Sequence, residues 1–532
     1  MLKKTLALAL SSAALVLAVA CGGSDLDAAP SATPPSPDAG PGDGSSPGSD
    51  PDPGTDATDA GTKPDASAAR PTLLVQGDIV LRGVTTDDHV IYTRMTTAGP
   101  ALEAVSLEDR VITTIWPSMP ADASIDVKGN VVAFWTNVDA ASGLGSFHYW
   151  TPGKAARMNV AELSVRDSFW STEDGKLVAF LANATLAEGV PTSAELVIAS
   201  TATGALTTVL TGAERVAFDV MSCGSSIDFA GETLVAAYCP TGSATARLVT
   251  VPDGVTPVRR VLVDGGLQPS WRADATGSKI FVVAQGDGEG RVVTNDGTDP
   301  APIAAVEAGV QEAFMMRDGS AVVYRTATTL RRAPITAAGP LVPVTIAAGD
   351  ALGILDVSLD QTLILYRSLP GVPVDAQNPD GERYFDLRTI RADATDGAPT
   401  VLVDTARALP LSLTGDGSRA LYFSKSPRLV AAASDGSGER SMPLVFSGMH
   451  VRPSGSGAIL TVNSRQLDQK VVTDLVHVDF SKDGPEAGSP ATKTIAESVG
   501  SGGYRFGVAS PSTLVYAHLA ATGQGLYRLD LP

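Results

Sequence analysis

This 532-residue chain contains three cysteines, whose thiols can form disulfides or be modified, depending on their surroundings. Cys21 follows an apolar N-terminal stretch, whereas Cys223 and Cys239 bracket "CGSSIDFAGETLVAAYC", a pattern typical of a turn between two adjacent strands. Neighbouring antiparallel strands bring Cα atoms within disulfide range, and a secreted chain meets oxidising conditions. We therefore expect a Cys223–Cys239 disulfide; two separate buried thiols are the alternative.

The histidines and carboxylates show no spacing typical of a metal site. The five histidines are far from one another along the chain, and no His-Glu-x-x-His motif occurs. The acidic stretches "GDGEG" (286–290) and "NDGTDP" (295–300) resemble fragments of calcium loops, but Asp-Gly is also the usual composition of a tight hairpin turn. The sequence predicts no metal and no cofactor, and a structural or exposed role for His89, His148, His450, His477 and His518.

Two stretches place aromatic and charged side chains together: "NVDAASGLGSFHYW" (137–150) and "LPGVPVDAQNPDGERYF" (369–385). Binding residues concentrate on exposed loops that a rigid scaffold carries. We therefore predict that both stretches are insertions and that their side chains form a contact surface. The alternative is that each loop only covers its own part of the fold. The predicted contact residues are His148, Tyr149, Trp150, Arg383 and Tyr384.

A repeated sequence pattern, a polar turn followed by a short apolar run, occurs ten times; we call each occurrence a phrase. The pattern indicates the turns and strands that position these side chains. A turn rich in Asp and Gly precedes five or six apolar residues, and successive phrases begin about 40–60 residues apart. With 53 Gly and 36 Pro, the chain has little scope for long helices. The phrases are residues 85–94, 126–136, 171–182, 228–239, 272–285, 316–326, 358–368, 414–425, 453–464 and 509–519.

Each phrase is followed by further short strands, which gives four antiparallel strands per unit. This pattern predicts an all-β fold, a β-propeller of about eight to ten blades over residues 71–532, with two stacked smaller propellers as the alternative. The apolar run after each turn should pack between blades. The last unit is one strand short, and "PTLLV" (71–75) matches "PTVLV" (399–403), the last strand of an internal unit. We therefore expect residues 71–76 to complete the final blade and close the ring.

Residues 1–20 have the composition of a secretion signal, because two lysines precede an apolar stretch that is short for a membrane span and ends at Ala20. The residues before Cys21 resemble a bacterial lipobox, although Ala18 stands where that motif prefers Leu. The resemblance implies cleavage before Cys21 and lipidation of its thiol; an ordinary secretion signal cut nearby is the alternative. Gly22, rather than Asp, after the cysteine favours the outer membrane by the sorting rules of such lipoproteins.

The charge distribution restricts the partners. Residues 21–70 are rich in Pro, Gly, Ser and Asp, which predicts a disordered acidic spacer after the lipidated cysteine. The whole chain has a net charge of −19, and about −14 remains on residues 71–532 once the leader and the spacer are set aside. An acidic body without clustered Lys and Arg disfavours binding to phosphate backbones, so no nucleic-acid partner is expected.

The repeated phrase resembles the repeat of TolB-like β-propellers, in which a Pro-Asp-Gly turn precedes an apolar strand that often ends in an aromatic residue. The proline is present only at Pro453 and Pro511, so the resemblance covers residues 71–532 in pattern and not in detail. It implies an extracytoplasmic propeller but no single activity, because such propellers include docking modules, peptidase gates and lyases. The matching aromatic residues are Tyr92, Phe134, Phe180, Tyr324, Tyr366, Phe423 and Tyr516.

These features predict a non-enzymatic binding module of the bacterial cell envelope, facing the periplasm or the cell surface. A lipid on Cys21 would hold it to the membrane, and a face of the propeller would dock an envelope protein or a glycan. The alternative is a secreted hydrolase or lyase whose catalytic residues converge in the propeller channel.

Overall fold

The chain is described here by a computed structural model. It describes residues 70–120, 122–218, 225–243, 247–252, 254, 258–261, 270–283, 290–294, 304–336, 341–373, 383–394, 399–424, 428–443, 446–467, 470–520 and 522–531. Those residues contain 39 strands, β1–β39, and one short 3-10 turn, η1 (Gly212–Glu214). In this part of the chain, no helix is long and apolar enough to span a membrane.

Strands β2 to β26 form six antiparallel sheets in chain order, and each sheet is one blade. In blade 3 an additional strand, β14 (Val216–Ala217), pairs with β12. Blade 1 consists of β2 (Ile79–Val84), β3 (His89–Thr96), β4 (Gly99–Ser106) and β5 (Ile112–Trp116); blade 2 of β6 (Ser124–Lys128), β7 (Val131–Thr136), β8 (Leu144–Trp150) and β9 (Arg157–Val165); blade 3 of β10 (Phe169–Ser171), β11 (Leu177–Ala187), β12 (Val190–Ser200) and β13 (Leu206–Leu210). Blade 4 consists of β15 (Ser226–Ala230), β16 (Thr233–Tyr238), β17 (Arg247–Val251) and β18 (Val258–Val261); blade 5 of β19 (Ser270–Ala273), β20 (Lys279–Val283), β21 (Gly290–Thr294) and β22 (Ala304–Ala305); blade 6 of β23 (Glu312–Met315), β24 (Ala321–Arg325), β25 (Thr329–Pro334) and β26 (Val344–Ala348).

The remaining strands form two seven-stranded sheets, because one long strand in each belongs to two consecutive blades. The first half of β30 pairs with β29 and its second half with β31; β37 divides in the same way between β36 and β38. Blades 7 and 8 are formed by β27 (Asp350–Val357), β28 (Leu363–Pro373), β29 (Arg383–Arg391), β30 (Thr400–Leu413), β31 (Arg419–Phe423), β32 (Arg428–Ala433) and β33 (Arg440–Pro443). Blades 9 and 10 are formed by β34 (Gly448–Val451), β35 (Gly457–Leu467), β36 (Lys470–Asp483), β37 (Pro490–Phe506), β38 (Thr513–His518), β39 (Gly525–Asp530) and β1 (Thr72–Gln76).

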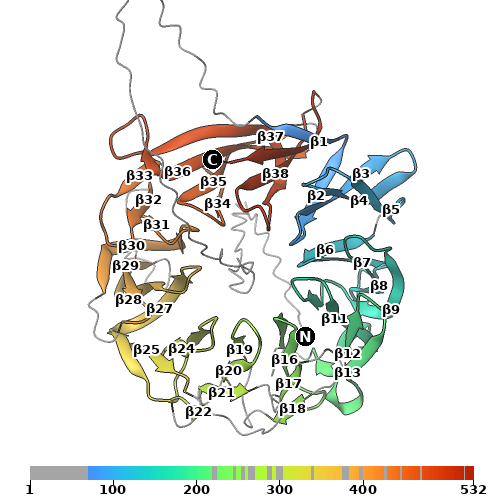
Figure 1. Cartoon of the computed structure of the whole chain (residues 1–532), viewed down its shortest axis with the longest axis horizontal. Helices are drawn as coiled ribbons and strands as arrows, with labels where there is room; N and C mark the ends of the chain where they lie inside the picture. The colour runs from blue at the N-terminus through green and yellow to red at the C-terminus, as the bar shows by residue number, and fades with distance from the viewer. Residues whose placement is uncertain are drawn as a thin grey trace, which may run out of the picture.

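The ten blades of the described residues are arranged in a single ring (Figure 1). Contacts between blades follow the order of the chain: β2 contacts β6, β9 contacts β11, and β19 contacts β23. The last blade also contacts the first, because β2 packs against β37, β38 and β39. The prediction of a propeller built from four-stranded antiparallel blades is therefore confirmed, and the single ring excludes two stacked propellers.

The repeated phrase forms the turn between the first and second strands of every blade. In blade 3, the Gly175 N–H donates to the Thr172 carbonyl at 2.9 Å, and the Thr172 hydroxyl donates to the Asp174 carboxylate at 2.8 Å. Gly175 has φ of +67°, a left-handed conformation that glycine adopts at little cost. Turns of adjacent blades also bond to each other, as when the Thr86 N–H donates to the Gly129 carbonyl at 3.1 Å. The composition of the phrase thus follows from turn geometry.

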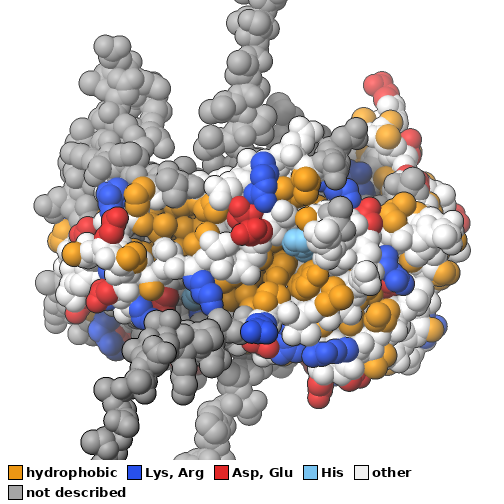
Figure 2. Space-filling model, turned by 90° about the horizontal axis from the view of Figure 1, so that it is seen from above, with side chains coloured by type: hydrophobic (Ala, Val, Ile, Leu, Met, Phe, Trp, Pro, Cys, Tyr) orange, Lys and Arg blue, Asp and Glu red, His pale blue; other side chains and the backbone are white. Residues whose placement is uncertain are grey.

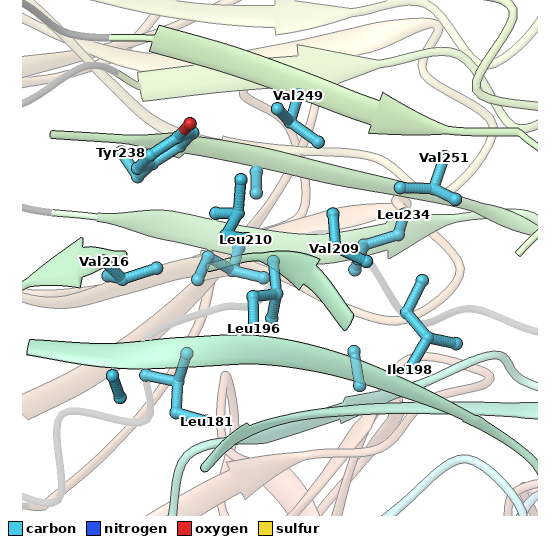
Figure 3. Close-up of a cluster of buried hydrophobic side chains, with 14 of the residues drawn as sticks. Leu181, Leu196, Ile198, Val209, Leu210, Val216, Leu234, Tyr238, Val249 and Val251 are labelled. Atoms are coloured by element: carbon cyan, nitrogen blue, oxygen red, sulfur yellow. The ribbon is translucent and has the colours of Figure 1, made fainter. Parts of the chain in front are cut away.

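The apolar run after each turn fills the space between neighbouring blades. Figure 3 shows one such cluster, which contains Leu196 of blade 3 together with Leu234 and Val249 of blade 4. All three side chains are fully buried. Burying a leucine or valine side chain contributes about 1.5–3 kcal/mol to folding. Blades therefore stabilise one another, and the outward-facing parts of a blade are left for other contacts.

The two ends of the described chain meet in blade 10. Strand β1 pairs antiparallel with β39, with Thr72 opposite Arg528. The Arg528 guanidinium donates to the Leu107 carbonyl of blade 1 at 2.7 Å. The Asp88 carboxylate of blade 1 accepts from the Ala509 N–H of blade 10 at 3.0 Å. Side-chain bonds therefore cross the boundary between the last blade and the first, which we name the seam between blades 10 and 1.

Candidate functional site

The first predicted contact stretch, residues 137–150, is for the most part not a loop. Its second half is strand β8, at the centre of blade 2, and His148, Tyr149 and Trp150 are only 1–2 % exposed. The prediction of an exposed insertion is wrong here because the aromatic residues are consecutive in a central strand, so they point alternately to its two faces, and both faces are buried. These three side chains present almost no surface to a partner.

His148 instead belongs to the core of blade 2. Its Nδ1 accepts a hydrogen bond from the Asn159 N–H at 2.8 Å, so Nε2 carries the proton and donates to the Thr136 hydroxyl at 2.9 Å. The ring stacks on Phe134, with centroids 5.2 Å apart. Burial lowers the pKa of His148 to about 4, because a charged imidazolium has no water around it there.

Stability should fall as the pH falls below the ordinary histidine range. The pKa of His477 is also lowered to about 4, first by burial and second by Arg452, whose guanidinium lies 3.2 Å from His477 Nε2. Because both pKa values are lower in the folded state, the unfolded chain binds more protons between pH 6.5 and 4. The stability of the fold is therefore complete above pH 6.5 and falls as the pH falls towards 4. We expect each histidine to cost on the order of 2–3 kcal/mol at pH 4.5.

The measurement is urea denaturation at pH 7.5 and 4.5. The variant His148→Gln should show a smaller loss of stability between the two pH values than the wild type. An unchanged loss in His148→Gln would contradict the assignment of a neutral buried imidazole.

The second predicted contact stretch, residues 369–385, lies partly outside the described residues. Arg383 and Tyr384 begin strand β29, and the backbone of Tyr384 pairs with Val372 in β28 and with Arg407 in β30. The side chains of Arg383 and Tyr384 are outside what the structure describes. Their role in a contact surface stays a prediction.

The cysteine predictions are only partly within the described chain. Cys239 follows β16, is 2 % exposed, and is disulfide-bonded. Its expected partner, Cys223, lies outside the described residues, as does Cys21.

A pocket of about 370 Å³ lies where blade 9 meets blade 10. One wall is the first half of β37, from Thr494 to Glu497, which is the outer strand of blade 9. The other wall is blade 10, which contributes residues of β38 and β39, the turn between those two strands, and the residue before β1. The pocket is lined by Pro71, Thr494, Ile495, Ala496, Glu497, Tyr516, His518, Thr522, Gly523 and Tyr527.

Three aromatic rings form the blade 10 wall of this pocket. Tyr516 and His518 are two positions apart on β38 and so lie on one face of the strand. Tyr527 is the cross-strand partner of Tyr516 on β39, and their rings stack with centroids 5.7 Å apart. His518 meets the Tyr527 ring edge-on at 5.9 Å. The pairing of two adjacent strands therefore assembles the three rings.

Hydrogen bonds fix the orientation of Tyr527 and His518, and burial holds Tyr516. The Tyr527 hydroxyl donates to the Gly523 carbonyl at 2.7 Å, and His518 Nδ1 lies 3.2 Å from the same oxygen. Tyr516 is 4 % exposed, and burial raises its pKa to about 12, so its ring stays neutral in the physiological range. Preordered rings lose little conformational freedom when a ligand binds on them.

Sequence reasoning missed this pocket. Tyr516 and His518 lie within the last repeated phrase, "ASPSTLVYAHL", and were attributed to the propeller pattern. The signal was the spacing of an aromatic residue and a histidine two positions apart near the end of a strand, which places both on one face. Only strand pairing could add Tyr527, and only the meeting of two blades could add Glu497.

Figure 2 shows the rim of the ring that carries the terminal blades. Hydrophobic side chains gather across the middle of this side, with a histidine among them and acidic and basic side chains around them. Among the residues that the structure describes, no group of three or more His, Cys, Asp or Glu side chains could hold a metal ion.

No protein-family model matches the chain, and no curated protein matches it. Solved structures similar to it include a eukaryotic initiation factor, at 12 % identity over 78 % of this chain and 87 % of that one, with a TM-score of 0.40. The C-terminal WD40 domain of Sif2 matches at 10 % identity over 87 % and 99 %, with a TM-score of 0.32. TolB from Acinetobacter baumannii matches at 13 % identity over 65 % and 76 %, with a TM-score of 0.24. Similarity this remote carries no functional argument.

Proposed function

We propose that this chain is a non-enzymatic binding module of the bacterial cell envelope that holds a glycan in the pocket between blades 9 and 10. The observation that carries the proposal is the stacked pair Tyr516–Tyr527, which forms a pocket wall beside hydroxyl and carboxylate groups. An aromatic face suits the apolar C–H face of a sugar ring, and the polar groups suit its hydroxyls. A volume of about 370 Å³ is near the lower end for ligand pockets, which favours a small unit such as a sugar ring.

The pocket supports binding better than hydrolysis. Glycoside hydrolysis commonly uses two carboxylates on either side of the scissile bond. Among the described residues that line this pocket, Glu497 is the one carboxylate. We therefore favour retention of the glycan over its cleavage.

The proposal places the module on a membrane through a lipid on Cys21 and through the acidic spacer of residues 21–70. The support is the lipobox-like sequence before Cys21 and the Pro, Gly, Ser and Asp composition of the spacer. An extended spacer would hold the ring away from the membrane surface. Since β1 begins at Thr72, next to the pocket residue Pro71, the spacer would join the propeller at a point beside the pocket.

Replacing Tyr527 with alanine should weaken sugar binding by about tenfold, because the stacking face is lost. The measurement is isothermal titration of the full-length chain with glucose, galactose, N-acetylglucosamine, glucosamine and glucuronate. Tyr527→Phe, which keeps the ring and loses only the bond to the Gly523 carbonyl, should bind nearly as well as the wild type. Thermal unfolding of both variants checks that the propeller is still folded. Failure of the wild type to bind any of the five sugars would overturn the proposed function.

A further inference from the structure

The charges among the residues that line the pocket are of one sign. Among its described lining residues there is one carboxylate, Glu497, and no lysine or arginine. Glu497 is exposed and close enough to share a pocket with Tyr516 and Tyr527. The body that carries the pocket is also acidic overall. A positively charged ligand would therefore meet a favourable potential on approach, and an anionic one would be repelled.

The charged hydrogen-bonding group among the described lining residues is an acceptor, the Glu497 carboxylate. Nδ1–H of His518 is directed to the Gly523 carbonyl, so this donor is already used within the protein. The Glu497 carboxylate accepts from several directions, and the Tyr527 hydroxyl already donates its proton to Gly523. A ligand rich in donors, such as an ammonium group, matches this set better than a carboxylate or a phosphate does.

The aromatic wall favours the same charge. Tyr516 is only 4 % exposed, so the half-buried Tyr527 presents the accessible face of the stacked pair. That face is electron-rich, and a cation near it is attracted by the ring quadrupole. An aromatic wall beside a single carboxylate is thus suited to an ammonium ion, while the same wall also suits a sugar ring.

We infer that the ligand is an amino sugar, a sugar ring that carries a protonated primary amine, with the ring on Tyr527 and the ammonium group at Glu497. The inference rests on the proposed function, since it names the class of glycan that the same pocket takes. Glucosamine and glucose provide the comparison, because they differ only in an ammonium group in place of a hydroxyl.

The test is isothermal titration of the full-length chain at neutral pH with glucosamine, glucose and glucuronate. The wild type should bind glucosamine about tenfold more tightly than glucose, and glucuronate most weakly. In Glu497→Gln the preference for glucosamine over glucose should fall to about twofold or less. Glu486→Gln is the matched control, since Glu486 is exposed and lies outside the lining residues; this variant should keep the full preference.

Equal affinities of the wild type for glucosamine and glucose would overturn the inference and leave the proposed function in place. A preference that survives in Glu497→Gln, or that falls equally in Glu486→Gln, would also overturn it, because the charge that matters would then not be Glu497. The absence of binding to any sugar would instead count against the proposed function itself.

Discussion

Replacing Val75 with aspartate should release β1 from blade 10 and lower the free energy of unfolding by about 4 kcal/mol or more, because it places an unpaired charge in an apolar cluster. Val75 is 4 % exposed and packs with side chains from both sides of the seam between blades 10 and 1, including Ile79, Tyr92 and Leu526. A charge at this position therefore acts on the last blade and the first together.

Leu73→Asp is the matched control for Val75→Asp. Leu73 lies on the same strand but is 44 % exposed, so the same substitution should cost less than about 1 kcal/mol. Urea denaturation followed by circular dichroism measures both variants, and hydrogen exchange of the β39 amides reports whether β1 has detached. Equal, small effects of the two substitutions would show that β1 is not needed to hold the ring closed.

Replacing Cys21 with serine should move the protein from the membrane fraction of the cell to the soluble fraction almost completely. A multi-acyl anchor contributes about 0.8 kcal/mol for each buried methylene, so its loss removes nearly all of the membrane affinity. The measurement is fractionation of cells together with labelling by a radioactive fatty acid. Ser24→Ala, three residues further along, is the control and should stay labelled and membrane-bound. If Cys21→Ser leaves fractionation unchanged, an ordinary secretion signal is the better interpretation of residues 1–20.

The fold was predictable from sequence because it is encoded locally. The turn around Gly175 needs a left-handed residue and side chains that accept from the backbone, as Asp174 does from the Lys176 N–H and Thr172 from the Leu177 N–H. A left-handed residue recurs at this turn in most blades. The apolar run that follows is a strand whatever its neighbours are. The way in which β30 and β37 each serve two blades was not predictable, because turn-favouring residues lie at the points of transfer, Pro410 in β30 and Gly500, Gly502 and Gly503 in β37, and such residues normally indicate a break between strands.

The candidate site was less predictable, because the same residue types serve the core and the surface. His148, Tyr149 and Trp150 appear suited to binding in the sequence, yet packing around blade 2 buries all three. Conversely, Tyr527 lies in an unremarkable strand and becomes part of a pocket only through pairing with β38 and contact with blade 9. Exposure is decided by long-range packing, which a single sequence does not encode by local pattern.

The central claim is that the pocket between blades 9 and 10 binds a sugar. It is tested most directly by an X-ray structure of the chain from crystals soaked in glucosamine. The account predicts density for a sugar ring against Tyr527, with its amine within hydrogen-bonding distance of the Glu497 carboxylate. A fully occupied sugar at another place on the ring, with this pocket empty, would contradict the claim.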